Sequence, residues 1–372
     1  MENNLPPQYP APPPLIPPGY AAPRPAGRGW MVLSILLILI LAVVLSGRAL
    51  FRMVPFLTWD GENDVRETSH HLEEVTIENP GAAEKIAIID VDGIITSQQL
   101  GRSGRNMSEL IQDELLVAGK DENVKAVILK VDSPGGEVMA SDIIANALTS
   151  FQDKHNKPVV VSMGSLAASG GYYVSAPCQW IVANELTLTG SIGVIMHGIN
   201  YRGLMDKVGL VPQTFKSGRF KDMLSGTKKP EEIDPEETKM IQDMIMETYN
   251  KFKQVVADGR KRAQEKNKGK GRTLATNWAD YADGRVLTGK QALELGFVDQ
   301  LGTFEAAVET TRKIAGISGR ARMIRYEEPF DLVNIFRIFG KSDVKTIKIE
   351  TGLEFPRLQA GRPYFLSTTL AN

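Results

Sequence analysis

The stretch AVILKVDSPGG, residues 126–136, joins an apolar run to a glycine turn and decides the fold class. Its first half, residues 126–131, is almost continuously apolar, which is typical of a strand that is covered on both faces of a sheet. A helical stripe follows the turn and is formed by Val138, Ile143, Ile144, Ala147, Leu148 and Phe151. A strand, a turn and a helix in this order predict one unit of an α/β fold.

Three further runs predict strands of the same kind, at residues 86–91, 159–163 and 180–183. Helical pattern separates the predicted strands, so we expect an α/β core that begins near Lys85. The chain has 372 residues, of which 42% are hydrophobic, and it is long enough to bury such a core.

A long amphipathic helix is predicted after residue 234. Asp234 suits the N-cap, Pro235 suits the first turn, and Glu237 is placed to close a capping box. The residues expected to share one face are Ile241, Met244, Ile245, Thr248, Phe252, Val255 and Val256. We interpret the methionines of this helix as core filler rather than as a binding surface.

The N-terminal region contains a proline-rich tail and an apolar segment. Residues 1–29 predict an extended, disordered tail. The 19 residues between Arg28 and Arg48 carry no charge, and at ~1.5 Å per residue they span roughly 28 Å of a hydrocarbon core that is ~30 Å thick. We therefore expect an uncleaved transmembrane anchor at 30–47, with a cleaved signal peptide as the alternative, and a juxtamembrane linker at 48–83. Arginines flank both ends, so charge alone does not set the orientation.

Charge and cysteine content exclude several kinds of function. The net charge of −1 gives no electrostatic case for a nucleic-acid partner. Cys178 is the single cysteine, which excludes an intrachain disulfide and a cysteine-rich zinc site, and we interpret it as a small buried hydrophobe. No metal or organic cofactor is indicated.

The motif GSLAASGGYY, residues 164–173, places Ser169 among small residues. A serine hydroxyl becomes a nucleophile when a base takes its proton, and the oxyanion that forms needs preorganised donors. The glycines after Ser169 and those of the DSPGG turn leave backbone amides free to donate. The candidate oxyanion-hole residues are therefore Gly135, Gly136 and Gly170.

The general base is harder to assign. Of the four histidines, only His197 is a reasonable candidate. A lysine is the alternative, and it serves as a base only when burial lowers its pKa from about 10.4. Lys216 and Lys221 both qualify by location, and spacing alone does not choose between them.

Four motifs together resemble the signal peptide peptidase A family. They are DSPGG at 132–136, AASGGYY at 167–173, LTGSIGV at 188–194 and ADGRVLTGKQA at 282–292. The resemblance covers residues 84–318, which we expect to form the peptidase domain, and leaves 319–372 as a C-terminal extension of unknown role. It implies an α/β fold like the core of Clp protease and crotonase, with stacked turns of strand and helix.

The resemblance also implies a Ser–Lys dyad. The nucleophile of the family falls on Ser169, its lysine base on Lys221, and a serine that orients the lysine on Ser191. The family position of the glycine pair supports Gly135 and Gly136 as oxyanion donors. Single-copy members of the family form homo-oligomeric rings in which neighbouring subunits complete each other's dyads.

The sequence therefore predicts a membrane-anchored serine endopeptidase. By resemblance, its catalytic domain lies on the extracytoplasmic side of the bacterial cell membrane and its substrates are remnant signal peptides. Two alternatives remain open: an acyl-CoA enzyme of the crotonase type, and a ring-forming membrane scaffold without turnover.

Overall fold

The computed structural model describes residues 72–98, 105–328 and 363–366. The expected tail and anchor, and the linker up to residue 71, lie outside the described residues. Within the described part of the chain, no helix is both long and apolar enough to cross a bilayer.

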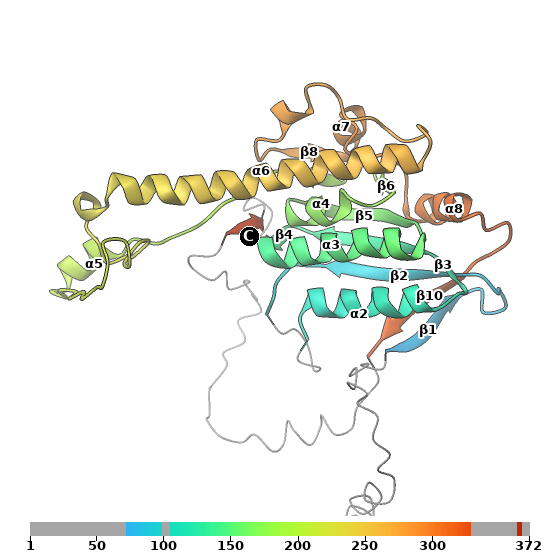
Figure 1. Ribbon diagram of the computed structural model, residues 1–372, viewed down its shortest axis with the longest axis horizontal. Coiled ribbons are helices and arrows are strands. Elements are labelled where there is room, and N and C mark those ends of the chain that lie inside the picture. Colours follow the sequence, from blue (N-terminus) through green and yellow to red (C-terminus); the bar gives the residue numbers. More distant parts are fainter. Residues whose placement is uncertain (1–71, 99–104, 329–362, 367–372) are drawn as a thin grey trace, which may run out of the picture. The chain divides into compact units, whose positions relative to one another are not determined.

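The core of the described chain is a nine-stranded mixed sheet in the order β1-β10-β2-β3-β5-β6-β9, extended by β7 beside β5 and β8 beside β7 (Figure 1). The strands are β1 Glu73–Glu78, β2 Lys85–Asp92, β3 Val124–Ser133, β5 Val159–Ala168, β6 Trp180–Ala183, β7 Leu188–Gly190, β8 Val286–Thr288, β9 Gln300–Leu301 and β10 Arg322–Glu327. Strands β2, β3, β5 and β6 contain the four predicted apolar runs and pair in parallel. The predicted α/β core is confirmed.

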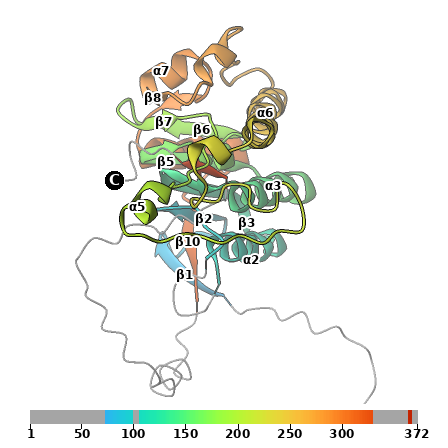
Figure 2. The same ribbon diagram turned by 90° about the vertical axis from the view of Figure 1, so that its left-hand side faces the viewer.

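Helices cover both faces of this sheet. They are α2 Met107–Lys120, α3 Val138–His155, α4 Gly170–Ser175, α5 Arg202–Lys207, α6 Pro235–Lys266, α7 Gly289–Glu294 and α8 Phe304–Ala315, with short 3₁₀ turns at Pro230–Glu232 and Trp278–Tyr281. Figure 2 shows α2, α3 and α6 on one side of the strands. On the opposite face, Ile86 and Ile128 pack against Phe304 and Val308 of α8. Alternate residues of β2 and β3 thus enter two separate cores, which explains their continuously apolar sequence.

Two strands, of which β1 is the edge, extend the sheet beyond the expected peptidase domain. β1 lies in the stretch expected as the juxtamembrane linker, and β10 lies in the stretch expected as the C-terminal extension. They pair antiparallel with each other, and β10 pairs in parallel with β2. All six residues of β1 are exposed, and only Val75 and Ile77 are apolar, so β1 lacks the continuous apolar run of the central strands.

The N-terminal half of α6 departs from the sequence prediction. Asp234 is the N-cap and accepts a hydrogen bond from the Glu236 amide at 2.9 Å, but Glu237 does not close a capping box. The interpretation of the methionines as core filler is wrong for this half of the helix, because Met240, Met244 and Met246 are exposed. Only the second half, with Phe252 and Val256, packs into the core, since the first half has no sheet beneath it (Figure 1).

A buried ion pair fastens the second half of α6 to the sheet. The Arg260 guanidinium donates to Asp299 at 2.5 Å, and both side chains are 1% exposed. Asp299 also accepts hydrogen bonds from the backbone amides of Ile181 and Arg272, at 2.9 and 3.0 Å. One carboxylate therefore joins α6, β6 and the loop that follows the helix.

Replacing Asp299 by alanine should lower the free energy of unfolding by about 3–5 kcal/mol, because the Arg260 charge remains buried without its partner. Urea unfolding of the full chain measures the loss. The control is Asp153→Ala, which removes the exposed partner of Arg262 and Lys266 and should cost no more than about 1 kcal/mol. Equal losses in the two variants would contradict this account of the Arg260–Asp299 pair.

Candidate active site

Ser169 lies at the junction between β5 and α4. It is the N-cap of α4, 1% exposed, with backbone angles φ 53° and ψ −115°. This conformation is strained for a residue with a Cβ, and such strain clusters at functional sites. The Ser169 amide donates to the carbonyl of Gly190 at 2.8 Å, which ties the junction to the end of β7.

Two tyrosines hold α4 in place. The Tyr172 hydroxyl donates to the Phe297 carbonyl at 2.9 Å, and the Tyr173 hydroxyl donates to Asp142 of α3 at 2.6 Å. The Tyr173 ring also packs edge-on against Phe252 of α6, with centroids 4.9 Å apart. Burial raises the pKa of both hydroxyls above the ordinary range, so they stay protonated as donors.

The two glycine turns meet beside Ser169. β3 and β5 are parallel neighbours, with Ser133 opposite Ala167, so the turns that follow them lie at the same edge of the sheet. A Cβ added at Gly170 would lie 3.0 Å from the Gly136 nitrogen and 3.1 Å from the Gly135 Cα. The structure therefore brings together all three glycines expected to form an oxyanion hole.

Their amides are not equivalent. The Gly135 amide donates to the Ser133 hydroxyl at 3.1 Å. The Gly135 carbonyl and the Glu137 amide both hydrogen-bond to the backbone of Ile95. Backbone groups of successive residues in a strand point to opposite sides, so the Gly136 amide points to the side away from Ile95. The Gly170 amide opens α4, where helix amides lack intrahelical acceptors. Gly136 and Gly170 are thus better candidates for oxyanion donors than Gly135.

An extended segment of the chain lies on that other side of β4, Gly135–Glu137. It is β11, Tyr364–Leu366, which pairs antiparallel with β4 and sets Phe365 opposite Gly136. The backbone of Tyr364 exchanges two hydrogen bonds with Ile195, at 3.0 and 3.1 Å. The slot between β4 and Ile195 therefore accepts an extended peptide backbone.

Ser191 lies next to Ser169. It follows β7, as Ser169 follows β5, and these strands are parallel with Ala168 opposite Gly190. Ser191 is buried, and its amide donates to the Arg285 carbonyl at 2.8 Å. Neither serine hydroxyl has a hydrogen-bond partner among the described residues, so both remain available to a further group.

The two candidate lysines differ in their contacts. The Lys216 ammonium donates to both oxygens of Asp222, at 2.9 and 3.0 Å, and to the Arg219 carbonyl at 3.1 Å. Lys221 is exposed, and its amine has no hydrogen-bond or ion-pair partner in residues 72–98, 105–328 and 363–366. The same part of the chain shows no hydrogen bond between Lys221 and Ser169. His197 is also exposed.

Three features of this region carried no signal in the sequence. Ile95 bonds to Gly135 and Glu137, and the Glu137 carboxylate accepts hydrogen bonds from the amide and hydroxyl of Ser97. Lys228 and Glu237 are buried in an otherwise exposed segment.

Cys178 is buried as predicted, and burial raises the pKa of its thiol, so it is no nucleophile.

Comparisons with known proteins agree with this geometry. The model of peptidase family S49 matches residues 151–318, and the model of Clp protease matches residues 88–179. A protein of Enterococcus faecium named as signal peptide peptidase SppA is 39% identical over 69% of this chain and 71% of its own length. A protein of Synechocystis sp. named as a protease is 37% identical over 76% of this chain and 96% of its own.

A more distant relative carries the same kind of name. Protease 4 of Haemophilus influenzae is 31% identical over 68% of this chain and 39% of its own length. The mixed α/β core also agrees with the Clp protease match. The chain belongs to peptidase family S49, the signal peptide peptidase A family, and is a serine peptidase.

Proposed function

We propose that this chain is a membrane-anchored endopeptidase in which Ser169 and Lys221 form the catalytic dyad and Ser191 orients the lysine. The observation that carries the proposal is the strained, buried Ser169 beside the backbone of Gly136 and Gly170. The anchor is the apolar segment at 30–47, and the catalytic domain is extracytoplasmic. The substrates are remnant signal peptides, in line with the name of the Enterococcus faecium relative.

The reaction divides peptide hydrolysis into two steps. Ser169 Oγ bonds to the substrate carbonyl carbon while its proton passes to the neutral Lys221 amine, and the Gly136 and Gly170 amides stabilise the oxyanion. The C–N bond then breaks, and the Lys221 ammonium gives its proton to the leaving amine. Water, deprotonated by the same lysine, hydrolyses the acyl ester and frees Ser169.

Substrates bind as an added strand. The antiparallel pairing of β11 with β4 supports this mode, because β11 is an extended segment whose backbone is held from both sides. A substrate in the place of β11 would set its backbone opposite Gly136. Main-chain hydrogen bonds then give affinity that tolerates many side chains, which suits a peptidase of diverse peptides.

A second copy of the chain completes the dyad. An amine is a base only in its neutral form, and burial favours that form, whereas Lys221 is exposed here. The segment that carries it also exposes large apolar side chains, including Ile199, Val211 and Phe215, which are 81%, 77% and 94% exposed. Such exposure is typical of a protein interface. We therefore propose a homo-oligomeric ring in which Lys221 reaches Ser169 of the neighbouring subunit.

Removing each lysine separates the two candidates for the base. Lys221→Ala should lower kcat for a fluorogenic peptide by about 10²–10⁴-fold, because the base is lost. Lys216→Ala should keep most activity, and Ser169→Ala should abolish both cleavage and labelling by a fluorophosphonate probe. An active Ser169→Ala variant would refute the proposed nucleophile, and the reverse lysine pattern would refute the proposed base.

Mixed assemblies test whether the dyad crosses subunits. Chains with Ser169→Ala and chains with Lys221→Ala should each have little or no activity alone, but co-assembled rings should regain part of the wild-type rate, because one chain supplies the lysine and the other the serine. Differently tagged chains allow mixed rings to be purified. No recovery in such rings would place the dyad within one chain.

Gly136 tests the oxyanion geometry. A Cβ at this position would lie 1.9 Å from the Ile95 carbonyl oxygen, so Gly136→Ala must displace β4 and its amide. We expect kcat to fall by roughly 10²-fold, as when one oxyanion donor is lost. Gly319→Ala is the matched control, since its Cβ meets nothing within 4 Å and it lies outside the segment that carries Lys221. Wild-type kcat in Gly136→Ala would contradict the assignment.

A further inference from the structure

The segment that carries Lys221 has a charged interior. Residues 193–251 are described throughout, and only Lys228 and Glu237 among them are buried, at 8% and 3% exposure. The large apolar side chains of the segment are mostly exposed. The fold of this part of the chain therefore depends on polar contacts rather than on an apolar core of its own.

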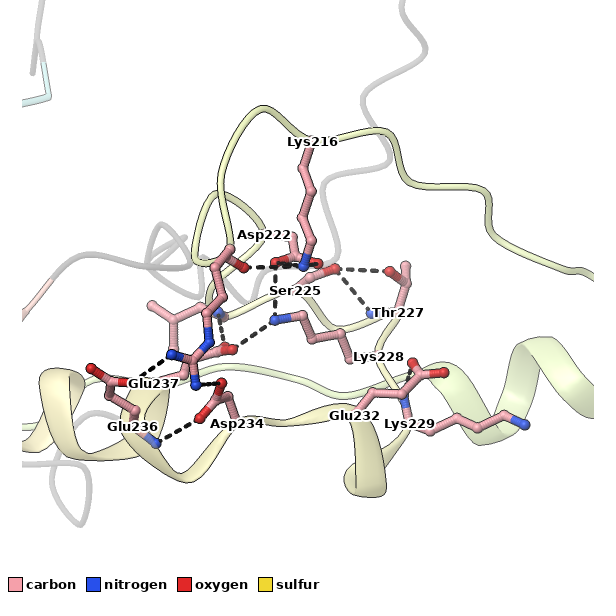
Figure 3. A network of polar contacts seen from close by, with 12 residues as sticks. Lys216, Asp222, Ser225, Thr227, Lys228, Lys229, Glu232, Asp234, Glu236 and Glu237 are labelled. Carbon is pink, nitrogen blue, oxygen red and sulfur yellow. Dashed lines mark hydrogen bonds and ion pairs between the residues drawn. The ribbon is translucent and has the colours of Figure 1, made fainter.

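These contacts form one continuous network, drawn in Figure 3. Glu237, in the first turn of α6, accepts hydrogen bonds from the Lys228 ammonium at 2.6 Å and from the Leu224 amide at 2.9 Å. The Lys228 ammonium also contacts Asp222 at 3.1 Å, and Asp222 binds Lys216. Glu237 thus connects α6 to the residue that directly follows Lys221.

The backbone beside Lys221 is strained and held by the same carboxylate. Leu224 has φ 64°, a left-handed conformation that is costly for a bulky side chain. The Leu224 amide donates a hydrogen bond to the Glu237 carboxylate. Strain of this kind persists only where the surroundings impose it, and it marks functional sites. The conformation of the turn at 221–224 therefore depends on Glu237.

The network holds two lysines of this segment, Lys216 and Lys228, in ion pairs. Burial favours the neutral form of Lys228, but the hydrogen bonds and charges of Glu237 and Asp222 outweigh it and raise the pKa of Lys228 above its ordinary value. The hydrogen bonds from Lys216 lower the pKa of Asp222, which therefore stays ionised. Lys216 and Lys228 are thus committed to structural ion pairs, and the amine of Lys221 is left available.

We propose that Glu237 is a positioning residue for the candidate base, and that it holds the turn bearing Lys221 through Leu224 and Lys228. This inference rests on the proposed dyad. A base must lie within hydrogen-bond reach of the nucleophile, and misplacement by about 1 Å can cost 100-fold in rate. If the lysine and the serine belong to different chains, the turn that bears the lysine must already have the right conformation when the chains associate. The hydrogen bonds of Glu237 impose that conformation.

Steady-state kinetics of the full-length protein test the proposal. Glu237→Gln should lower kcat by roughly 10- to 100-fold with KM unchanged, because the substrate slot is intact and the base is displaced. The control is Glu247→Gln, an exposed carboxylate on the same helix, which should behave as wild type. Wild-type kcat in an assembled Glu237→Gln variant would overturn the proposal.

Mixed rings separate positioning from a general structural role. Glu237→Gln added to the Ser169→Ala chain, which supplies the lysine, should suppress the recovered activity. The same change in the Lys221→Ala chain, which supplies the serine, should leave it intact. Equal suppression from both chains would overturn the proposal. If Ser169→Ala alone remains active, the proposed function fails instead, so the two failures are distinguishable.

A second variant tests the proposal without leaving an unpaired buried charge that could unfold the segment. Lys228→Met with Glu237→Leu removes both buried charges together, a replacement that buried ion pairs often tolerate. It also removes the acceptor of the Leu224 amide. An assembled double variant should show the same fall in kcat, and full activity would overturn the proposal.

Discussion

The parallel pairing of β3 with β5 is the constraint on which the candidate active site depends. It brings two turns, separated by more than thirty residues, to the same edge of the sheet, where Gly170 lies against Gly135 and Gly136. A Cβ at Gly170 would press against Ser141 and the backbone of both turn glycines, and one at Gly136 would collide with the Ile95 carbonyl oxygen. Ser169 is strained because β5 must end and α4 must begin at this contact. The surrounding anchors, Tyr172 and Tyr173, then hold the serine where the backbone amides converge.

The core and the segment at 193–251 are stabilised by different forces. In the core, β2, β3 and β5 bury apolar side chains on both faces, and the Arg260–Asp299 pair fastens α6 to β6. In residues 193–251 the two buried side chains are charged, and most of the large apolar side chains are exposed. Exposed apolar side chains of this kind are typical of a protein interface. The same segment carries Lys221, so in the proposed ring one contact between subunits would cover these side chains and bury the base.

Much of the core could be predicted from the sequence because its signals are local. The apolar runs of β2, β3, β5 and β6, the stripe of α3 and the glycine turns each depend on neighbouring residues. The pairing of β1 with β10 and of β11 with β4 could not be predicted, since those partners are far apart in the chain and local sequence does not show which strands meet. The helical stripe of α6 was predicted too far toward its N-terminus, because periodicity does not reveal whether a sheet lies beneath a helix.

The candidate site could also be predicted only in part from the sequence. Ser169 and the three glycines stand out by composition, and the structure brings them together. Spacing could not choose between Lys216 and Lys221, whereas the contacts of Lys216 with Asp222 favour Lys221 as the base. Glu237 was expected to close a capping box because its position fits that motif, but the buried Lys228 ammonium binds it more strongly than a backbone amide would.

The central claim is that a lysine from one chain activates the serine of another. A structure of the assembled, full-length protein tests it most directly, through the distance between Lys221 Nζ and Ser169 Oγ. The account predicts that the two atoms lie within hydrogen-bond reach, about 2.6–3.2 Å, across a subunit boundary. An assembly in which the Lys221 amine remains in solvent, or in which another group lies against Ser169 Oγ, would contradict it.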